Sequence, residues 1–107
     1  MILQNGLEIA DSAIQKYFIR LTNQIYKLLP SREEGVDWQK PLSTLIEEIL
    51  GMKDIFINYQ DKLLALLCKL QGLHSLQEEK DFLLYRRTIF ECLGIMNEVA
   101  EDVNRQY

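Results

Sequence analysis

The side chains that most often carry out chemistry are scarce in this sequence. His74 is the single histidine, and Cys68 and Cys92 are the only cysteines. A nucleophilic cysteine needs a base beside it, and a metal centre needs several ligands that converge on one point. His74 falls in a predicted helix break, and both cysteines stand among leucines and isoleucines, where burial raises a thiol pKa. We therefore expect two reduced, mostly buried thiols and a solvated histidine, with no catalytic, metal or cofactor site.

Acidic side chains are the next candidates for metal chemistry. Glu47 and Glu48 are adjacent within a predicted helix, and Glu98 and Asp102 lie near the end of the chain. This arrangement resembles the all-α nucleotide pyrophosphohydrolases of the MazG type, which bind magnesium with Glu-Glu-x-x-Glu on one helix and Glu-x-x-Asp on the next. Gly51 stands where the third carboxylate of the first motif would be. The resemblance implies a magnesium-dependent nucleotide hydrolase that uses these four acids, and this is our second alternative function.

Basic side chains form two small groups. Lys16, Arg20 and Lys27 follow one another on the first predicted helix, and Arg86-Arg87 lies within the last one. Several such charges acting together can bind a phosphate backbone. The net charge of −4 disfavours a nucleic-acid partner but does not exclude one. Our first alternative is therefore a small nucleic-acid-associated subunit of a larger complex, using these five residues.

Length and composition indicate one all-α domain that spans residues 1–107. Hydrophobic residues make up 48% of the chain and charged residues 26%, whereas there are only 5 glycines and 2 prolines. This composition is typical of a globular protein, and so few turn-forming residues imply long elements without a β-fold. The first residues do not have the pattern of a signal peptide, and no apolar run reaches the roughly 20 residues that span a bilayer. We expect a cytoplasmic protein without membrane contact.

Hydrophobic periodicity predicts three long helices, at about 5–29, 39–71 and 76–104. The first should end before Pro30, because a helix usually stops ahead of a proline. The second carries a heptad seam without a break, and the third carries a shorter one. The seam of the second consists of Leu42, Leu45, Ile49, Met52, Phe56, Tyr59, Leu63, Leu66 and Leu70. The short connection between the second and third helices predicts that they lie antiparallel, whereas the longer first connection leaves the first helix freer in placement. We expect an antiparallel bundle of three long helices.

A second apolar stripe lies beside the seam of the middle helix, at Ile46, Leu50, Ile57, Leu64 and Leu67. Two stripes make a face that is wider than one partner helix can cover. The helix either lies between two neighbours of its own chain or lends one stripe to another molecule. Because a three-helix bundle has little interior, we expect oligomerisation to complete it.

The sequence thus favours a non-enzymatic protein–protein interaction module, such as a small adaptor, assembly subunit or inhibitor, that acts through helix–helix packing. Its partner would be a second copy of itself or another helical protein. The candidate partner-binding residues are Trp38, which stands outside the regular seams, and the second stripe.

Overall fold

The computed structural model describes residues 1–107 except 1–10, 55 and 106–107, and it is all-helical over the described residues. Four α-helices pack together: α1 (Asp11–Glu33), α2 (Gln39–Met52), α3 (Gln60–Leu73) and α4 (Phe82–Arg105). Short 3-10 turns, η1 (Ile57–Tyr59) and η2 (Glu79–Asp81), precede α3 and α4. The predicted all-α bundle is confirmed, but the predicted count of three long helices is wrong.

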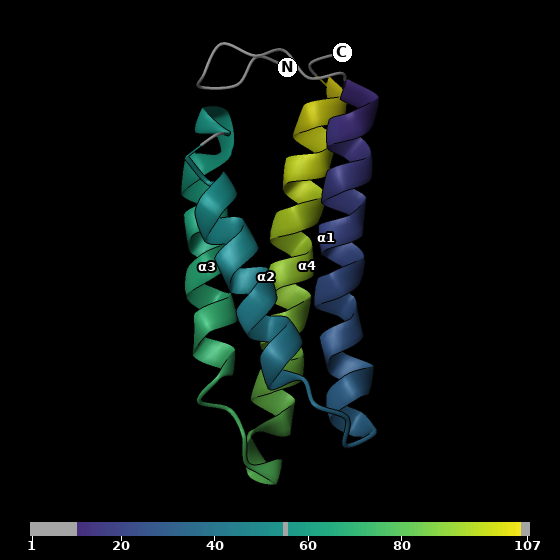
Figure 1. Ribbon diagram of the computed structural model, residues 1–107, viewed down its shortest axis with the longest axis vertical. Coiled ribbons are helices and arrows are strands. Elements are labelled where there is room, and N and C mark those ends of the chain that lie inside the picture. The colour runs from purple at the N-terminus through teal and green to yellow at the C-terminus, as the bar shows by residue number, and fades with distance from the viewer. Residues whose placement is uncertain (1–10, 55, 106–107) are drawn as a thin grey trace.

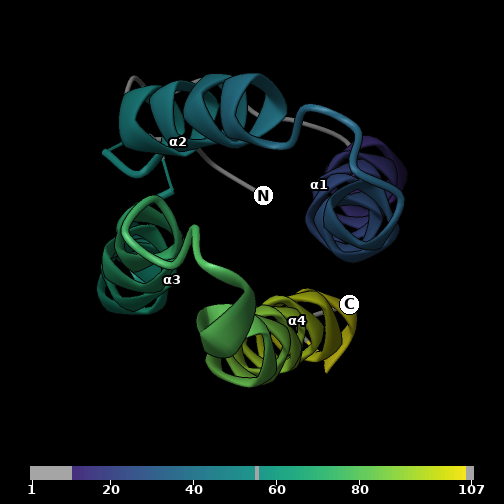
Figure 2. The same cartoon turned by 90° about the horizontal axis from the view of Figure 1, so that it is seen from below.

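The four helices run alternately up and down (Figure 1). Each helix lies beside the helices before and after it, and α4 closes the bundle against α1 (Figure 2). The assembly measures 45 × 21 × 20 Å. Figure 2 shows α1 nearly end-on and α2 nearly side-on, so α2 is strongly inclined to the bundle axis. Because α2 is inclined, it cannot pack closely against α1 along its whole length.

The predicted middle helix, 39–71, is instead two antiparallel helices of 14 residues each. The chain turns back between Met52 and Gln60, which the unbroken heptad seam did not reveal. Met52 and Tyr59 are seven residues apart with Phe56 between them, so the turn takes up one whole heptad. All three side chains are buried in the core, and the apolar spacing therefore carries no sign of the reversal.

Weak helix formers in this segment were the available signal. Gly51, Asp54 and Asn58 fall within eight residues, and each lowers helix propensity. The Asp54 carboxylate accepts hydrogen bonds from Lys53 Nζ and Gln60 Nε2, both at 3.0 Å, so it bridges the two sides of the turn. These local preferences cost a straight helix little by themselves, so the gain from packing two helices on one core decides the turn.

The first helix does not end before Pro30, as predicted, but continues to Glu33. Its end is set by Gly35, which has a φ of 74°. The N–H of Val36 bonds the carbonyl of Ser31 at 2.8 Å, and the N–H of Gly35 bonds the carbonyl of Arg32 at 3.2 Å. These two bonds form a Schellman motif, in which glycine supplies the left-handed residue. The predicted start at residue 5 lies outside the described residues.

The last helix begins at Phe82 rather than at residue 76, because η2 occupies the segment before it. At this end of the bundle, the Arg32 side chain of α1 donates hydrogen bonds to the carbonyl oxygens of Leu76 and, at 2.7 Å, Glu78. These two hydrogen bonds hold the α3–α4 connection against α1. The backbone is extended at Glu78, where ψ is 153°.

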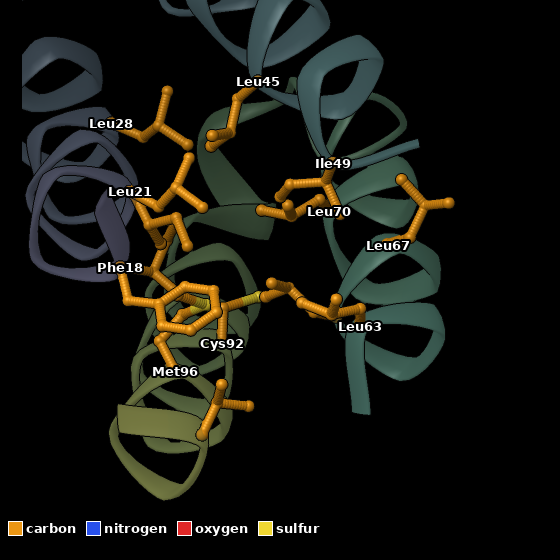
Figure 3. Close-up of a cluster of buried hydrophobic side chains, with 14 of the residues drawn as sticks. Phe18, Leu21, Leu28, Leu45, Ile49, Leu63, Leu67, Leu70, Cys92 and Met96 are labelled. Atoms are coloured by element: carbon orange, nitrogen blue, oxygen red, sulfur yellow. The ribbon is translucent and has the colours of Figure 1, made fainter. Parts of the chain in front are cut away.

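One core fills the space between the helices, and every helix contributes to it (Figure 3). The heptad residues predicted for the middle helix are all buried, and so are Tyr85, Ile89, Cys92, Met96 and Val99 of α4. Phe18 of α1 packs against Phe56 and Tyr59, with ring centroids 5.5 and 6.3 Å apart. Four helices enclose more interior than three would, so most of the apolar residues are covered within one chain.

Candidate interaction surfaces

The second apolar stripe lies along the junction of α2 and α3, on the outer side of the core. Gln39 and Ser43 of α2 reach His74 at the end of α3, with 2.7 Å from His74 Nδ1 to Gln39 Oε1 and 3.4 Å from Nε2 to Ser43 Oγ. His74 therefore contributes to the α2–α3 junction.

Folding covers part of this stripe. Leu67 is buried and Ile46 is partly buried against the core, whereas Leu50 and Leu64 remain 48% and 49% exposed. Figure 3 shows Leu67 to one side of the central group. The side chain of Ile57 lies outside the described residues. The chain thus covers two residues of the second stripe, Ile46 and Leu67, and leaves two others half exposed.

Trp38 lies at the end of the bundle, where the α1–α2 connection meets α4. Its ring packs edge-on against Tyr85, with centroids 5.0 Å apart. The Arg32 guanidinium lies over both rings, 5.4 Å from the centroid of Trp38 and 4.4 Å from that of Tyr85. The ring contact and the cation–π contacts hold Trp38, which is half-buried, in a structural position.

A different apolar surface, which the sequence analysis did not single out, lies over the junction of α1 and α4. In α1, Tyr17 precedes the core residue Phe18, and its hydroxyl bonds Glu48 of α2 at 3.0 Å. Ile19, which follows Phe18, therefore lies on the opposite flank of α1, toward α4. Tyr26 is two turns further along on the same flank. Ile19 and Tyr26 are 56% and 54% exposed.

The same reasoning places the exposed residues of α4. Glu91 and Glu98, each one residue before a core residue, bond Lys69 and Lys62 of α3. Leu83 and Phe90, each one residue after a core position, therefore lie on the flank toward α1. Leu83 is 76% exposed and Phe90 is 47% exposed. The spacing of seven between Leu83 and Phe90, as between Ile19 and Tyr26, was the signal in the sequence.

We call this surface the α1–α4 face, and its middle consists of exposed residues: Ile19, Asn23, Tyr26, Leu83, Arg86, Arg87, Phe90, Gly94 and Asn97. This part contains two basic side chains, Arg86 and Arg87, whereas the acidic Glu33, which lies beside Leu83, and Glu101 lie toward its two ends. Arg86 lies over the ring of Phe90, 5.1 Å from its centroid. Arg87 is 3.6 Å from Glu91, at the border of the face. The face is therefore apolar, aromatic and basic.

The structure separates the five basic residues that were predicted to act together. Arg86 and Arg87 share the α1–α4 face, whereas Arg20 and Lys27 lie on the α2 side of α1, and Lys16 is about three helical turns from Lys27 on that side. Arg20 bonds Glu48 Oε1 at 2.5 Å, and Lys27 lines a groove between α1 and α2. A phosphate chain crossing the α1–α4 face would thus contact two of the five.

The four acids of the magnesium prediction also have separate partners or positions. Glu48 accepts hydrogen bonds from Tyr17 and Arg20 of α1, and Glu98 pairs with Lys62 of α3 at 2.8 Å. Glu47 of α2 and Asp102 of α4 lie on helices that are not neighbours in the bundle. Over the described residues, no group of three or more His, Cys, Asp or Glu side chains is placed to hold a metal ion.

The two cysteines differ in environment. Cys92 is fully buried, and burial raises the pKa of its thiol to about 12. Cys68 is exposed, so the expectation that both are mostly buried is wrong for this residue. Cys68 follows the stripe residue Leu67 by one position, which turns it outward from the α2–α3 junction. Both are free thiols.

A groove of about 550 Å³ lies between α1 and α2. Its floor includes Leu28 and Leu45, which are buried, and Pro41. The polar lining residues are Gln24, Lys27, Ser31, Asp37, Lys40, Thr44 and Glu48. It occupies the side on which the inclined α2 diverges from α1.

The fold defines a class, the all-helical up-and-down four-helix bundle. Comparison with protein-family models, with curated proteins and with solved structures found no match to this chain. No helix among the described residues is long and apolar enough to cross a membrane.

Proposed function

We propose that this protein is a non-enzymatic interaction module that binds an acidic amphipathic helix of a partner protein on its α1–α4 face. The observation that carries the proposal is the composition of that face. Exposed Ile19, Tyr26, Leu83 and Phe90 lie together on two adjacent helices, with Arg86 and Arg87 beside Phe90 and acidic side chains only toward the ends of the face.

The groups on the face suit a helix with an apolar stripe. Exposed apolar residues repeat every seven positions on both helices, so they follow the junction of α1 and α4 for about two turns. A partner helix laid along this junction would bury its own residues at i, i+3, i+4 and i+7. Tyr26 and Phe90 provide the large rings that often dominate interface energetics.

The basic side chains of the face indicate which charges the partner helix should carry beside its apolar stripe. Arg86 makes no ion pair with a described residue, and Arg87 makes only the 3.6 Å contact with Glu91. Glutamates beside an apolar stripe would complement these two charges, whereas lysines there would be repelled. The proposal therefore commits to an acidic partner helix.

Two synthetic helical peptides test the proposal. They share one apolar stripe, but one has glutamates and the other has lysines on its flanks, and binding is measured by titration calorimetry. We expect the acidic peptide to bind at least tenfold more tightly than the basic one. Phe90→Ser together with Arg86→Gln should weaken acidic-peptide binding by at least tenfold.

A matched control comes from the α2–α3 junction. Leu50 and Leu64 are as exposed as Phe90, so Leu50→Ser with Leu64→Ser removes similar apolar surface from the second stripe. We expect this pair to leave peptide affinity unchanged. If it abolishes binding while the α1–α4 variant does not, the working surface is the one that the sequence analysis favoured. Equal binding of the two peptides would contradict the acidic partner.

Self-association is a competing use of the same face. Light scattering over a dilution series measures it, and a homo-oligomer remains a prediction of the sequence. A dimer that Phe90→Ser with Arg86→Gln converts to monomer would make a second copy the occupant and would contradict our proposal.

Nucleic-acid binding is a second candidate function, favoured by the position of Arg86 over Phe90. Exposed aromatic rings beside basic side chains can stack and pair with single strands. Anisotropy of a labelled single-stranded RNA measures this, and Arg86→Glu with Arg87→Glu should then abolish a salt-sensitive affinity. Retention of affinity in this variant would eliminate the second candidate.

A further inference from the structure

We propose that the groove between α1 and α2 binds a small organic anion that carries an apolar ring or alkyl body. The groove measures about 550 Å³, within the range of small-molecule sites. It shares no residue with the α1–α4 face, so the proposal is independent of the function proposed above.

The charges that line the groove favour an anion. Lys27 of α1 and Lys40 of α2 both line it, and neither forms an ion pair with a described residue. Because Arg20 pairs with Glu48, the two ammonium groups on opposite walls face one carboxylate without a cationic partner, that of Asp37, so the potential between the walls is positive. A carboxylate, sulfonate or phosphate group held between the walls would be attracted by both ammonium groups at once.

The two acids in the groove are already engaged. Asp37 Oδ1 accepts hydrogen bonds from the backbone N–H groups of Gln39 and Lys40, at 3.0 and 3.4 Å, and so caps the start of α2. Glu48 Oε1 accepts from the Tyr17 hydroxyl and from Arg20. Because Arg20 compensates the charge of Glu48, the lysines remain available to a ligand.

The floor of the groove determines the rest of the ligand. Leu28 and Leu45 expose little surface individually, but with Pro41 they make most of the groove wall apolar. The hydroxyl of Thr44 is bonded to the Lys40 carbonyl at 3.1 Å, which leaves its methyl group to line the groove. An inorganic anion would leave this wall uncovered, whereas an apolar body attached to the anionic group would cover it.

A matched pair of fluorescent probes tests the proposal. 8-Anilinonaphthalene-1-sulfonate and N-phenyl-1-naphthylamine share one ring system, and only the first carries an anionic group. We expect saturable binding of the sulfonate at least tenfold tighter than that of the neutral amine. Amide chemical shifts should move at 24–31 and 37–48. Inorganic sulfate alone should bind much more weakly than either probe.

Variants identify the site. Lys27→Gln with Lys40→Gln should weaken sulfonate binding at least fivefold without changing the affinity for the neutral amine, and Thr44→Phe should fill the groove and weaken both probes. Arg87→Gln, on the α1–α4 face, is the control and should change neither. Equal affinity for the two probes would overturn the proposal. Chemical-shift changes confined to α4, or an unchanged affinity in the double variant, would also overturn it.

Discussion

The Tyr85 hydroxyl of α4 donates a hydrogen bond to the backbone carbonyl of Leu28 in α1, at 3.1 Å inside the buried junction of the two helices. This bond and the edge-on contact of Tyr85 with Trp38 connect α4 to α1 and to the connection that follows it. A buried hydroxyl without a partner would cost free energy, so the bond also fixes the depth at which α4 sits against α1.

Tyr85→Phe removes this bond and keeps the ring. We expect the free energy of unfolding to fall by about 1 kcal/mol, the usual net value of one such bond. Urea denaturation followed by circular dichroism measures it. Tyr26→Phe, in which the lost hydroxyl is exposed, is the control and should be neutral. Equal losses in the two variants would show that the Tyr85–Leu28 bond contributes nothing specific.

Stability should fall at alkaline pH. Burial raises the pKa of the Cys92 thiol and of the Tyr85 hydroxyl to about 12, from ordinary values of 9.0 and 10.0. Above the lower values the unfolded chain loses these protons while the folded protein keeps them. The free energy of unfolding therefore keeps its full value below about pH 9. It falls toward pH 12 by at most about 1.4 kcal/mol per pH unit for each group.

The contribution of Cys92 can be isolated by Cys92→Ala. This variant should be less stable at every pH because it leaves a small cavity. Its stability should nevertheless decline less steeply between pH 9 and 11, which urea titrations at several pH values would measure. A slope identical to that of the wild type would contradict the assignment to Cys92.

Gly35→Ala should destabilise the protein by about 1 kcal/mol, because Gly35 has a φ of 74° that a β-carbon disfavours. Gly94→Ala is the matched change in a helix interior. A β-carbon there meets nothing within 4 Å, so the higher helix propensity of alanine should stabilise the protein by up to about 1 kcal/mol. Thermal unfolding measures both, and the same sign for the two variants would refute the Schellman ending of α1.

The turn between α2 and α3 predicts a short distance between two positions that a straight helix would separate. In a continuous helix, residues 47 and 68 would be about 32 Å apart at ~1.5 Å per residue. The contact of Ser43 with His74 instead places Glu47 nearly level with Cys68 on neighbouring helices. Helix axes in contact are about 8–10 Å apart.

Pulsed electron resonance with nitroxides on Cys68 and on Glu47→Cys, in a Cys92→Ala background, measures this distance. We expect a peak below about 25 Å, allowing for the label arms added to the helix spacing. Labels on Arg87→Cys and Asn97→Cys within α4 provide a reference, at about 15 Å of helical rise. A main peak above 30 Å for the first pair would show that residues 39–71 form one helix.

Loss of the Arg32 side chain should lower the free energy of unfolding more than loss of a surface arginine. It donates hydrogen bonds to the carbonyl oxygens of Leu76 and Glu78 and lies over the rings of Trp38, Phe82 and Tyr85. Arg32→Gln should lower the free energy of unfolding by about 1–3 kcal/mol, because it removes charged donors together with the cation–π contacts. Arg87→Gln, a surface arginine of the last helix, is the control, and chemical denaturation should show little change. A neutral Arg32→Gln would show that the stack does not stabilise the fold.

The sequence by itself determined which side chains enter the core. The seam residues from Leu42 to Leu70 are buried as the heptad pattern predicts, because burial follows from local periodicity whichever way the helix runs. Periodicity could not reveal the reversal between Met52 and Tyr59, since the turn keeps the heptad spacing. That reversal depends on the gain from packing α2 and α3 on a common core.

The candidate surfaces depended still more on tertiary structure. The stripe that includes Leu50 and Leu64 is divided by the turn between two antiparallel helices, which leaves these two side chains about half exposed and buries Leu67. Tyr26 and Phe90 lie on one surface because α1 packs against α4. The pattern within either helix does not predict which helix will be its neighbour. The sequence supplied the residue types, whereas the side-by-side placement of α1 and α4 decided which of them form one surface, because that surface joins residues more than sixty positions apart.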